Sequence, residues 1–112
     1  MNEDMMFRVL VTVNTEYHIR DNVCVAVRSR GAGAFFSIHG AIGRRVDGYI
    51  ETHPRTKEMV LARRSANPKI GHVICFCPGG MIRPEDAMVT SAIVEMRPPT
   101  EEEIASYPSS IL

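Results

Sequence analysis

The sequence predicts a single, mainly β domain of about seven strands, arranged as a roll, a barrel or a sandwich, with a short C-terminal helix. Three observations lead to this prediction. Apolar and polar residues alternate in several short runs, as they do in half-buried strands. Glycine, proline, asparagine and aspartate separate the runs at roughly ten-residue spacing, which is typical of all-β domains. One capping-box pattern near the C-terminus indicates the helix.

The N-terminal quarter predicts three strands joined by tight turns. Residues 7–13 alternate with three valines on one face, which is the period of a half-buried strand. Residues 17–19 form a short extended piece, and Asp21-Asn22 supplies side chains that bond their own backbone in turns. Residues 23–28 repeat the alternation. A hairpin is therefore expected at the start of the chain.

The segment that follows Gly31-Ala32-Gly33 has two interpretations. Residues 34–38 are expected to return as a strand after a glycine turn. The alternative is a helical turn near residues 36–42, because apolar residues and a histidine also occur at helical spacing there, with Gly43 placed as a helix stop.

The second half of the chain predicts four further strands. Residues 46–52 and 58–63 have strand-like patterns that end at His53-Pro54 and Asn67-Pro68. Residues 71–80 contain the most continuous apolar run, and they predict a central strand buried on both faces and stopped by Pro78 and two glycines. Residues 88–96 form a long candidate strand.

The C-terminal helix is expected at residues 101–106. Pro98-Pro99 ends the preceding strand, and Thr100-Glu101-Glu102-Glu103 has capping-box spacing with acidic residues where the helix dipole favours them. The expected core consists of the inward-facing apolar residues of all these segments. These are Val9, Val11, Val13, Val23, Val25, Val27, Ile50, Leu61, Val73, Ile74, Phe76, Ile93 and Val94.

Composition indicates one soluble globular domain. The chain has 112 residues, 45% of them hydrophobic and 23% charged, and no apolar run approaches the ~20 residues that a membrane-spanning helix needs. The acidic N-terminus argues against a signal peptide, so a cytoplasmic location is expected. Three cysteines in a chain of this length predict free thiols rather than a disulfide framework. No cofactor is expected.

The net charge of zero hides an uneven distribution. Residues 20–69 contain ten basic residues and four acidic ones, so this segment carries +6 and the two ends together carry −6. Such asymmetry indicates an anionic partner, or acidic ends packed against a basic middle within the fold or across a subunit contact.

Six arginines near predicted turns are the candidate partner-binding residues, because guanidinium groups bind carboxylates and phosphates with two hydrogen bonds. They are Arg28, Arg30, Arg44, Arg45, Arg63 and Arg64. The leading hypothesis is a non-enzymatic binding or assembly module that contacts another protein or itself. The alternative is a nucleic-acid-binding β-barrel that uses the basic segment, and a solvated rim without a partner remains open.

The cysteines give a second alternative, a cysteine-dependent enzyme or a zinc-binding protein. His72, Cys75 and Cys77, with Cys24, have the residue types of a four-ligand zinc site. On an extended backbone, however, Cys75 and Cys77 hold their sulfurs ~6 to 7 Å apart, against the ~3.7 Å of one tetrahedral metal, so no metal site is expected. Cys77 precedes glycines whose amides suit an oxyanion, but no base is assigned, and no catalytic residue is predicted.

Overall fold

The computed structural model describes residues 6–31, 33–52, 59–60, 67–77 and 88–108. Strands dominate this part of the chain, and one short helix follows them. The elements are β1 (Phe7–Val11), β2 (Thr15–Arg20), β3 (Val23–Ser29), β4 (Arg45–Thr52), β5 (Met59–Val60), β6 (Val73–Cys77), β7 (Met88–Ala92), β8 (Glu95–Arg97) and α1 (Glu101–Ala105). The predicted mainly β fold with a short C-terminal helix is confirmed. No helix in these ranges has the length and apolar character that crossing a membrane requires.

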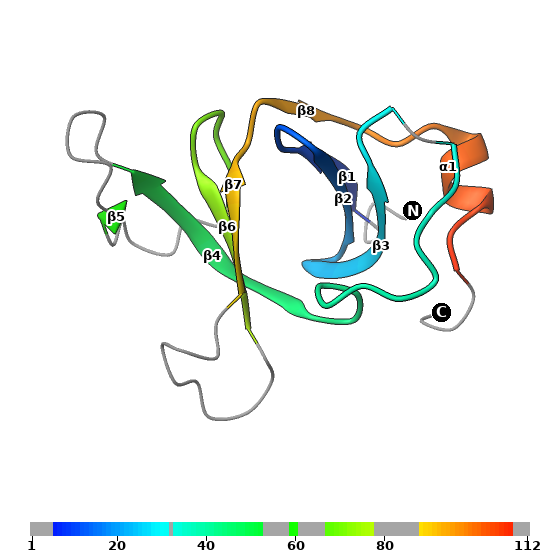
Figure 1. The fold of residues 1–112 in the computed structure, drawn as a ribbon, viewed down its shortest axis with the longest axis horizontal. Helices are drawn as coiled ribbons and strands as arrows, with labels where there is room; N and C mark the ends of the chain where they lie inside the picture. Colours follow the sequence, from blue (N-terminus) through cyan, green and yellow to red (C-terminus); the bar gives the residue numbers. More distant parts are fainter. Residues whose placement is uncertain (1–5, 32, 53–58, 61–66, 78–87, 109–112) are drawn as a thin grey trace.

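The strands form one antiparallel sheet in the order β7-β6-β4-β3-β2-β1-β8, with β5 paired to β4 beside this path. The sheet is open in its strand pairing, yet its two end strands, β7 and β8, are consecutive in the chain. Ile93 and Val94 join them, and the N–H of Ile93 donates to the carbonyl of His72 while that of Val94 donates to the carbonyl of Val11. The sheet therefore curls so that this link bonds both to the residue before β6 and to β1, which are next to opposite ends of the strand order. β8 then passes from β7 towards α1 (Figure 1).

This link corrects the prediction of one long strand over residues 88–96. The chain bends at Ile93 and Val94 because successive amides there bond to different segments, His72 before β6 and Val11 on β1. Ile93 points into the core, as predicted, but Val94 is 41% exposed, so its assignment to the core is wrong.

The N-terminal hairpins are confirmed. Asp21 and Asn22 both have positive φ, +48° and +71°, the backbone conformation that a tight turn between β2 and β3 demands. The preceding turn closes through the N–H of Thr12, which donates to the carbonyl of Thr15 at 2.8 Å. Val13 lies in that turn, beyond the end of β1, and is 57% exposed, so its predicted place in the core is wrong.

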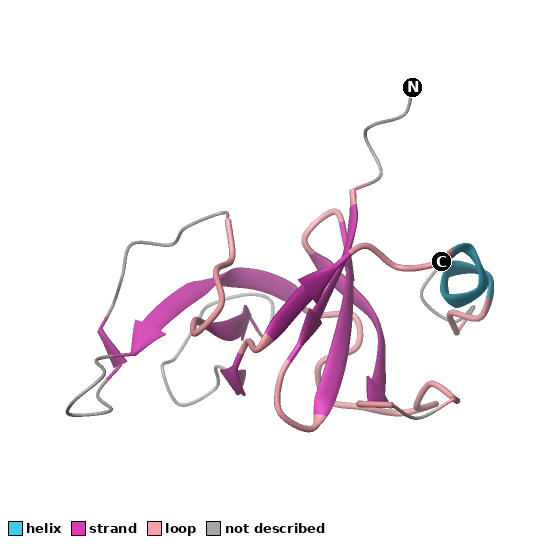
Figure 2. Cartoon of the chain, turned by 90° about the horizontal axis from the view of Figure 1, so that it is seen from above, coloured by secondary structure: helices cyan, strands magenta, loops and turns pink. Residues whose placement is uncertain are grey.

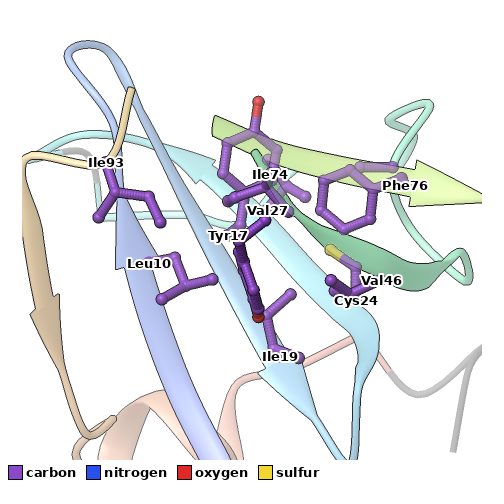
Figure 3. Close-up of a cluster of buried hydrophobic side chains, with 11 residues drawn as sticks. Leu10, Tyr17, Ile19, Cys24, Val27, Val46, Ile74, Phe76 and Ile93 are labelled. Carbon is purple, nitrogen blue, oxygen red and sulfur yellow. The ribbon is translucent and has the colours of Figure 1, made fainter. Parts of the chain in front are cut away.

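The main core fills the space between β1–β3 and the strands β4 and β6 (Figure 3). Of the predicted core, Val9, Val11, Val25, Val27, Val73, Ile74, Phe76 and Ile93 are buried. Val23 and Ile50 are only half-buried, and Leu61 lies outside the described residues. The prediction missed Leu10, Tyr17, Ile19, Val46 and Tyr49, which are all buried. Alternation alone assigns one buried face to a strand, whereas β1, β2 and β3 bury side chains on both.

The second face of β1–β3 is covered by the C-terminal segment. Val25, Ala26 and Tyr107 form a smaller apolar cluster there, with Phe7, Phe35 and Ile104 packed against it. The predicted capping box is present: the Thr100 hydroxyl accepts from the Glu103 amide, and the Glu103 carboxylate accepts from the Thr100 amide. Figure 2 shows α1 at one side of the molecule, beside the strands that it covers.

Residues 34–43 form neither the expected strand nor the alternative helix but an irregular loop with a turn at 40–43. Phe35 packs against the smaller cluster and Ile42 against the main core, on opposite faces of the sheet. A helix would direct the apolar residues of its single stripe to one face of the sheet only, so it could not make both contacts. The side chain of His39 also accepts from the amide of Ala41 at 3.1 Å. This bond gives the backbone a local partner in place of a hydrogen bond to a neighbouring strand.

Two other predicted strands are found only in part. Within residues 58–63, the structure describes Met59–Val60, which pair with β4, and the rest lies outside the described residues. Within residues 71–80, β6 spans Val73–Cys77 between β4 and β7, with Gly71 in a turn at φ +94°. β6 is thus an interior strand, but β3 rather than β6 lies in the middle of the strand order.

Candidate functional site

One cluster of ionisable side chains lies between the sheet and the C-terminal segment. We call it the ionic cluster: Glu16, His18, Arg28, Arg97 and Glu103, with Tyr107 hydrogen-bonded to it. Glu16, His18 and Glu103 are buried. Such a cluster is the first place to look for chemistry, because buried charged groups have perturbed proton affinities.

Strand alternation and register bring these residues together. Glu16 and His18 are two positions apart on β2 and therefore share a face. Glu16 pairs opposite Arg28 on β3, and Val9, which pairs opposite His18, also pairs opposite Arg97 on β8. Three strands, β2, β3 and β8, thus present polar side chains on the face that α1 covers with Glu103.

Two arginines bridge the two carboxylates. Arg97 forms a bidentate pair with Glu103, with Nη1 to Oε1 and Nη2 to Oε2 both at 2.8 Å. Arg28 donates from Nε to Glu16 at 2.8 Å and from Nη2 to Glu103. Arg97 also reaches Glu16, at 3.3 Å. Two positive and two negative groups therefore compensate each other, which a buried site requires.

His18 lies between the cluster and a group of aromatic rings. Its Nε2 is 3.2 Å from Glu16 Oε1 and its Nδ1 is 2.7 Å from the Tyr107 hydroxyl. Phe35 and Tyr107 pack edge-on against the imidazole at centroid distances of 4.9 and 5.2 Å. The carboxylate of Glu16 can only accept, so the network assigns the proton of neutral His18 to Nε2, and the Tyr107 hydroxyl donates to Nδ1.

The proton affinities follow from this arrangement. Hydrogen bonds from Arg97 lower the pKa of Glu103 to about 2. Burial raises the pKa of Glu16, but hydrogen bonds from Arg28 and His18 outweigh burial, so its pKa is lowered. Burial lowers the pKa of His18 despite the neighbouring carboxylates, and burial with the charge of Glu103 raises the pKa of Tyr107. At neutral pH both carboxylates are ionised and His18 is neutral.

Glu16, His18 and Glu103 are the only described residues grouped closely enough to suggest a metal site, with ligand atoms within 4.8 Å of one another. The residues do not fit a cation. Both carboxylates already accept from guanidinium groups, and both imidazole nitrogens have partners. A divalent ion would add its charge beside two arginines.

The ionic cluster is equally unsuited to catalysis. His18 has 0% of its surface exposed, and Glu16 and Glu103 are exposed by less than a tenth. A general base must come within hydrogen-bond reach of its substrate, and here α1, Phe35 and the neighbouring strands fill that space. What the cluster does is fasten α1 to the sheet.

A groove lies next to the ionic cluster and is open to solvent. Its volume is about 370 Å³, and three parts of the chain line it. We call it the β1–β8 groove: Phe7, Arg8 and Leu10 from β1, Met96, Arg97 and Pro98 from β8 and the residue after it, and Asn67 with Pro68 from the loop before β6. Arg97 belongs to both the groove and the ionic cluster. This groove is therefore the accessible candidate site.

Among the predicted arginines that the structure describes, Arg28 and Arg45 lie far apart. Arg45 pairs opposite Val23 at the start of β3, whereas Arg28 lies five residues further along that strand, roughly 15 Å away at about 3.3 Å per residue. Arg28 is turned inward to Glu16 and Glu103, and its guanidinium lies 4.9 Å above the Phe35 ring. A role for the whole set in partner binding stays a prediction.

The other predicted arginines have separate surroundings. Arg30 is half exposed and lies 4.0 Å from Glu95, and Arg44 donates to the carbonyl of Gly40 at 2.7 Å. Arg45 is exposed. Arg63 and Arg64 lie outside the described residues.

Two of the three cysteines, Cys24 and Cys75, can be placed in the fold. Cys24 lies in the main core, where burial raises its thiol pKa to about 12. Cys75 alternates with Ile74 and Phe76, which point into that core, so its side chain is on the other face of β6. His72 precedes the strand and Cys77 ends it. Cys24 and Cys75 therefore lie in different parts of the fold.

Sequence reasoning missed Glu16, His18, Arg97 and Tyr107 and assigned Glu103 to helix capping alone. Capping is one of its two roles, since Oε1 accepts from both the Thr100 amide and Arg97. A signal was present: Glu16 and His18 occupy alternate positions on a strand whose neighbour β1 supplies Val9 and Val11 to the same face. Two polar residues on an apolar face indicate a buried polar network.

No protein-family model matches the chain, and no significant match is found among curated proteins or solved structures.

Proposed function

We propose that this chain is a non-enzymatic binding module that contacts another protein, or a second copy of itself, through the β1–β8 groove. One observation supports the proposal above the others: an open groove lined mainly by apolar residues lies along a sheet strand, β8, that pairs with β1 alone among the described strands. Grooves of this kind and unpaired strand edges are the surfaces that proteins use to bind extended segments.

The surroundings of the groove support the same function. Met96 is 41% exposed within it, and methionine offers a soft, adaptable apolar surface that suits a protein partner. The ionic cluster behind the groove fastens α1 and, through Arg97, one wall of the groove. A wall held by buried ion pairs is preorganised, which lowers the entropy that binding costs.

The experiment tests binding at the groove without knowledge of the partner. Random peptides displayed on phage are selected against the immobilised wild-type chain and against two variants. Met96→Glu places a charge in the groove. Val94→Glu is the matched control, because Val94 has the same 41% exposure and does not line the groove. Sedimentation of the wild-type chain over a wide concentration range tests self-association in parallel.

We expect peptides to be enriched on the wild-type chain and on Val94→Glu but not on Met96→Glu, or a self-association with the same dependence on these variants. Enrichment that Met96→Glu leaves intact would place binding elsewhere and overturn the proposal. The absence of both enrichment and self-association would overturn it as well.

A further inference from the structure

We infer that the outer edge of β7 pairs with β7 of a second copy of this chain, antiparallel about Thr90, so that the sheets of two chains join into one. The inference goes beyond the proposed function, because β7 lies at the other end of the strand order from β8 and does not line the β1–β8 groove. With a second copy on β7, the groove is left for another protein.

The position of β7 in the sheet provides the first part of the argument. β7 is the last strand in the order, and among the described strands it pairs with β6 alone. In an antiparallel pair, successive residues direct their N–H and C=O groups to opposite sides. The outer edge of β7 therefore presents a row of backbone groups to which no described strand is paired. Such an edge is a template for the addition of a further strand.

The composition of this edge provides the second part. Residues 88–94 contain no charged residue, no proline and no glycine, and four of these seven residues are β-branched. Proteins commonly protect a strand edge from pairing with charged residues or proline. β8 has both, because Glu95 and Arg97 lie in the strand and Pro98-Pro99 follows it. β7 rather than β8 therefore has the composition of a strand that another strand covers.

The order of side-chain sizes along β7 favours a second copy as the partner. Antiparallel pairing about Thr90 places Met88 opposite Ala92 of the other copy. The same register places Val89 opposite Ser91 of the other copy. Each pair joins a larger side chain to a smaller one, and no like charges face each other across the strands. Because the arrangement has two-fold symmetry, each of these pairs occurs twice.

The contacts that β7 makes within its own chain are compatible with this pairing. Its side chains alternate between half-buried and exposed. Met88 packs against the main core, and the Thr90 hydroxyl accepts from the Ile74 amide of β6 at 3.0 Å. Val89 is 38% exposed. A strand added at the outer edge would leave the pairing with β6 in place and would cover part of Val89.

A strand of another protein is the main competitor for this edge. β7 has no charged side chain that could select a particular foreign segment, whereas its size order is complementary to its own sequence read in the antiparallel direction. Each copy contributes a strand of five residues, so the contact is small and the dimer should be weak and reversible, with a dissociation constant in the micromolar range.

Sedimentation of the wild-type chain at rising concentration measures the dimer, and variants test the strand. In the paired strands the two copies of position 89 lie diagonally, about 7 to 8 Å apart, so Val89→Lys brings like charges together. We expect this variant to raise the dissociation constant about tenfold or more, which is about 1.4 kcal/mol. Val94→Lys is the control, because Val94 is 41% exposed but lies beyond the end of β7, and it should change the dissociation constant little.

A mixing experiment tests the register. Chains with Val89→Lys and chains with Ser91→Glu should associate with each other more tightly than either variant does with itself, because the register places the lysine of one chain opposite the glutamate of the other. A mixture of Val89→Lys and Ser91→Lys chains is the matched control and should not restore association. Thermal melts establish that each variant is folded.

A wild-type chain that remains monomeric, even one that binds a strand of another protein at β7, would overturn the inference. Self-association that Val89→Lys leaves unchanged would place the contact elsewhere, and a mixture of opposite charges that restores nothing would refute the register. The proposed function is tested separately. Peptides that enrich at the groove of a monomeric chain would support the groove and refute the dimer. A dimer that Met96→Glu does not affect, without peptide enrichment, would do the reverse.

Discussion

Glu103→Gln is the substitution that tests the ionic cluster most directly. Glu103 is the residue of α1 whose carboxylate pairs with both Arg28 and Arg97, and its side chain is 9% exposed. Glutamine keeps the size of the side chain and an oxygen that can accept from the Thr100 amide, so the capping box is retained. The substitution removes the negative charge and leaves Arg28 and Arg97 with Glu16 alone.

The expected loss in the free energy of unfolding follows from the lowered pKa of Glu103. The pKa of Glu103 falls from its usual 4.5 to about 2 in the folded chain, and each unit corresponds to about 1.4 kcal/mol, so the charge contributes about 3 kcal/mol to the free energy of unfolding. Loss of one partner from a buried ion pair costs a similar amount, about 3 to 5 kcal/mol. For a domain of this size, the melting temperature should fall on the order of 10 °C.

The contribution of Glu103 to the free energy of unfolding should decrease in acid. Because the folded pKa is lower than the unfolded one, the contribution is fully present above pH 4.5 and is lost as the pH falls towards about 2. The difference in unfolding free energy between the wild-type chain and Glu103→Gln should therefore be constant near neutral pH and should narrow below pH 4.5.

Urea unfolding followed by circular dichroism at several pH values measures this difference. Glu102→Gln is the matched control, because Glu102 is the preceding residue of the same helix and is exposed. We expect the control to change the unfolding free energy by less than about 0.5 kcal/mol. A cost below about 1 kcal/mol for Glu103→Gln, or a difference that does not narrow in acid, would show that the cluster contributes no such electrostatic stability.

Three further predictions concern buried groups near the cluster and in the core. Burial lowers the pKa of His18, so the stability of the wild-type chain should decline as the pH falls below about 6.5, where the unfolded chain takes up a proton that the folded chain resists. His18→Gln should show a weaker decline in urea unfolding between about pH 7 and pH 5, and an equal slope would contradict the assignment. Tyr107→Phe keeps the ring but removes the 2.7 Å bond to His18, which should cost about 1 to 2 kcal/mol in thermal unfolding, and an unchanged melting temperature would exclude that bond. The Cys24 thiol, with its pKa raised to about 12, should react slowly at neutral pH in the folded chain and rapidly in denaturant, as mass-mapped labelling can establish. Labelling of Cys24 at the rate of a free thiol would place it outside the core.

The features that the sequence determined by itself are local ones. The strands within residues 7–13 and 23–28, the Asp21-Asn22 turn and the Thr100–Glu103 capping box appear in the structure as predicted, although Val13 lies in a turn and an irregularity in the pairing of β2 with β3 puts Val25 and Val27 in different clusters. Each depends on residues within a few positions of one another, so the backbone period and side-chain chemistry suffice to predict it. The same reasoning predicted the mainly β class and the helix after the last strand.

Tertiary structure alone decided which face each strand buries and what covers it. Arg28 is a partner-binding candidate in the sequence, but in the fold it is half-buried and donates to Glu103, although the two residues lie 75 positions apart. Arg97 reaches Glu16 across 81 positions, and the same arginine lines the β1–β8 groove. β7 and β8 are consecutive in the chain but pair at opposite ends of the sheet, and this connection brings α1 over β2 and β3. No local sequence pattern encodes that connection. Burial follows from it, because a polar side chain becomes part of the interior only when a distant segment supplies both its cover and its counter-charge.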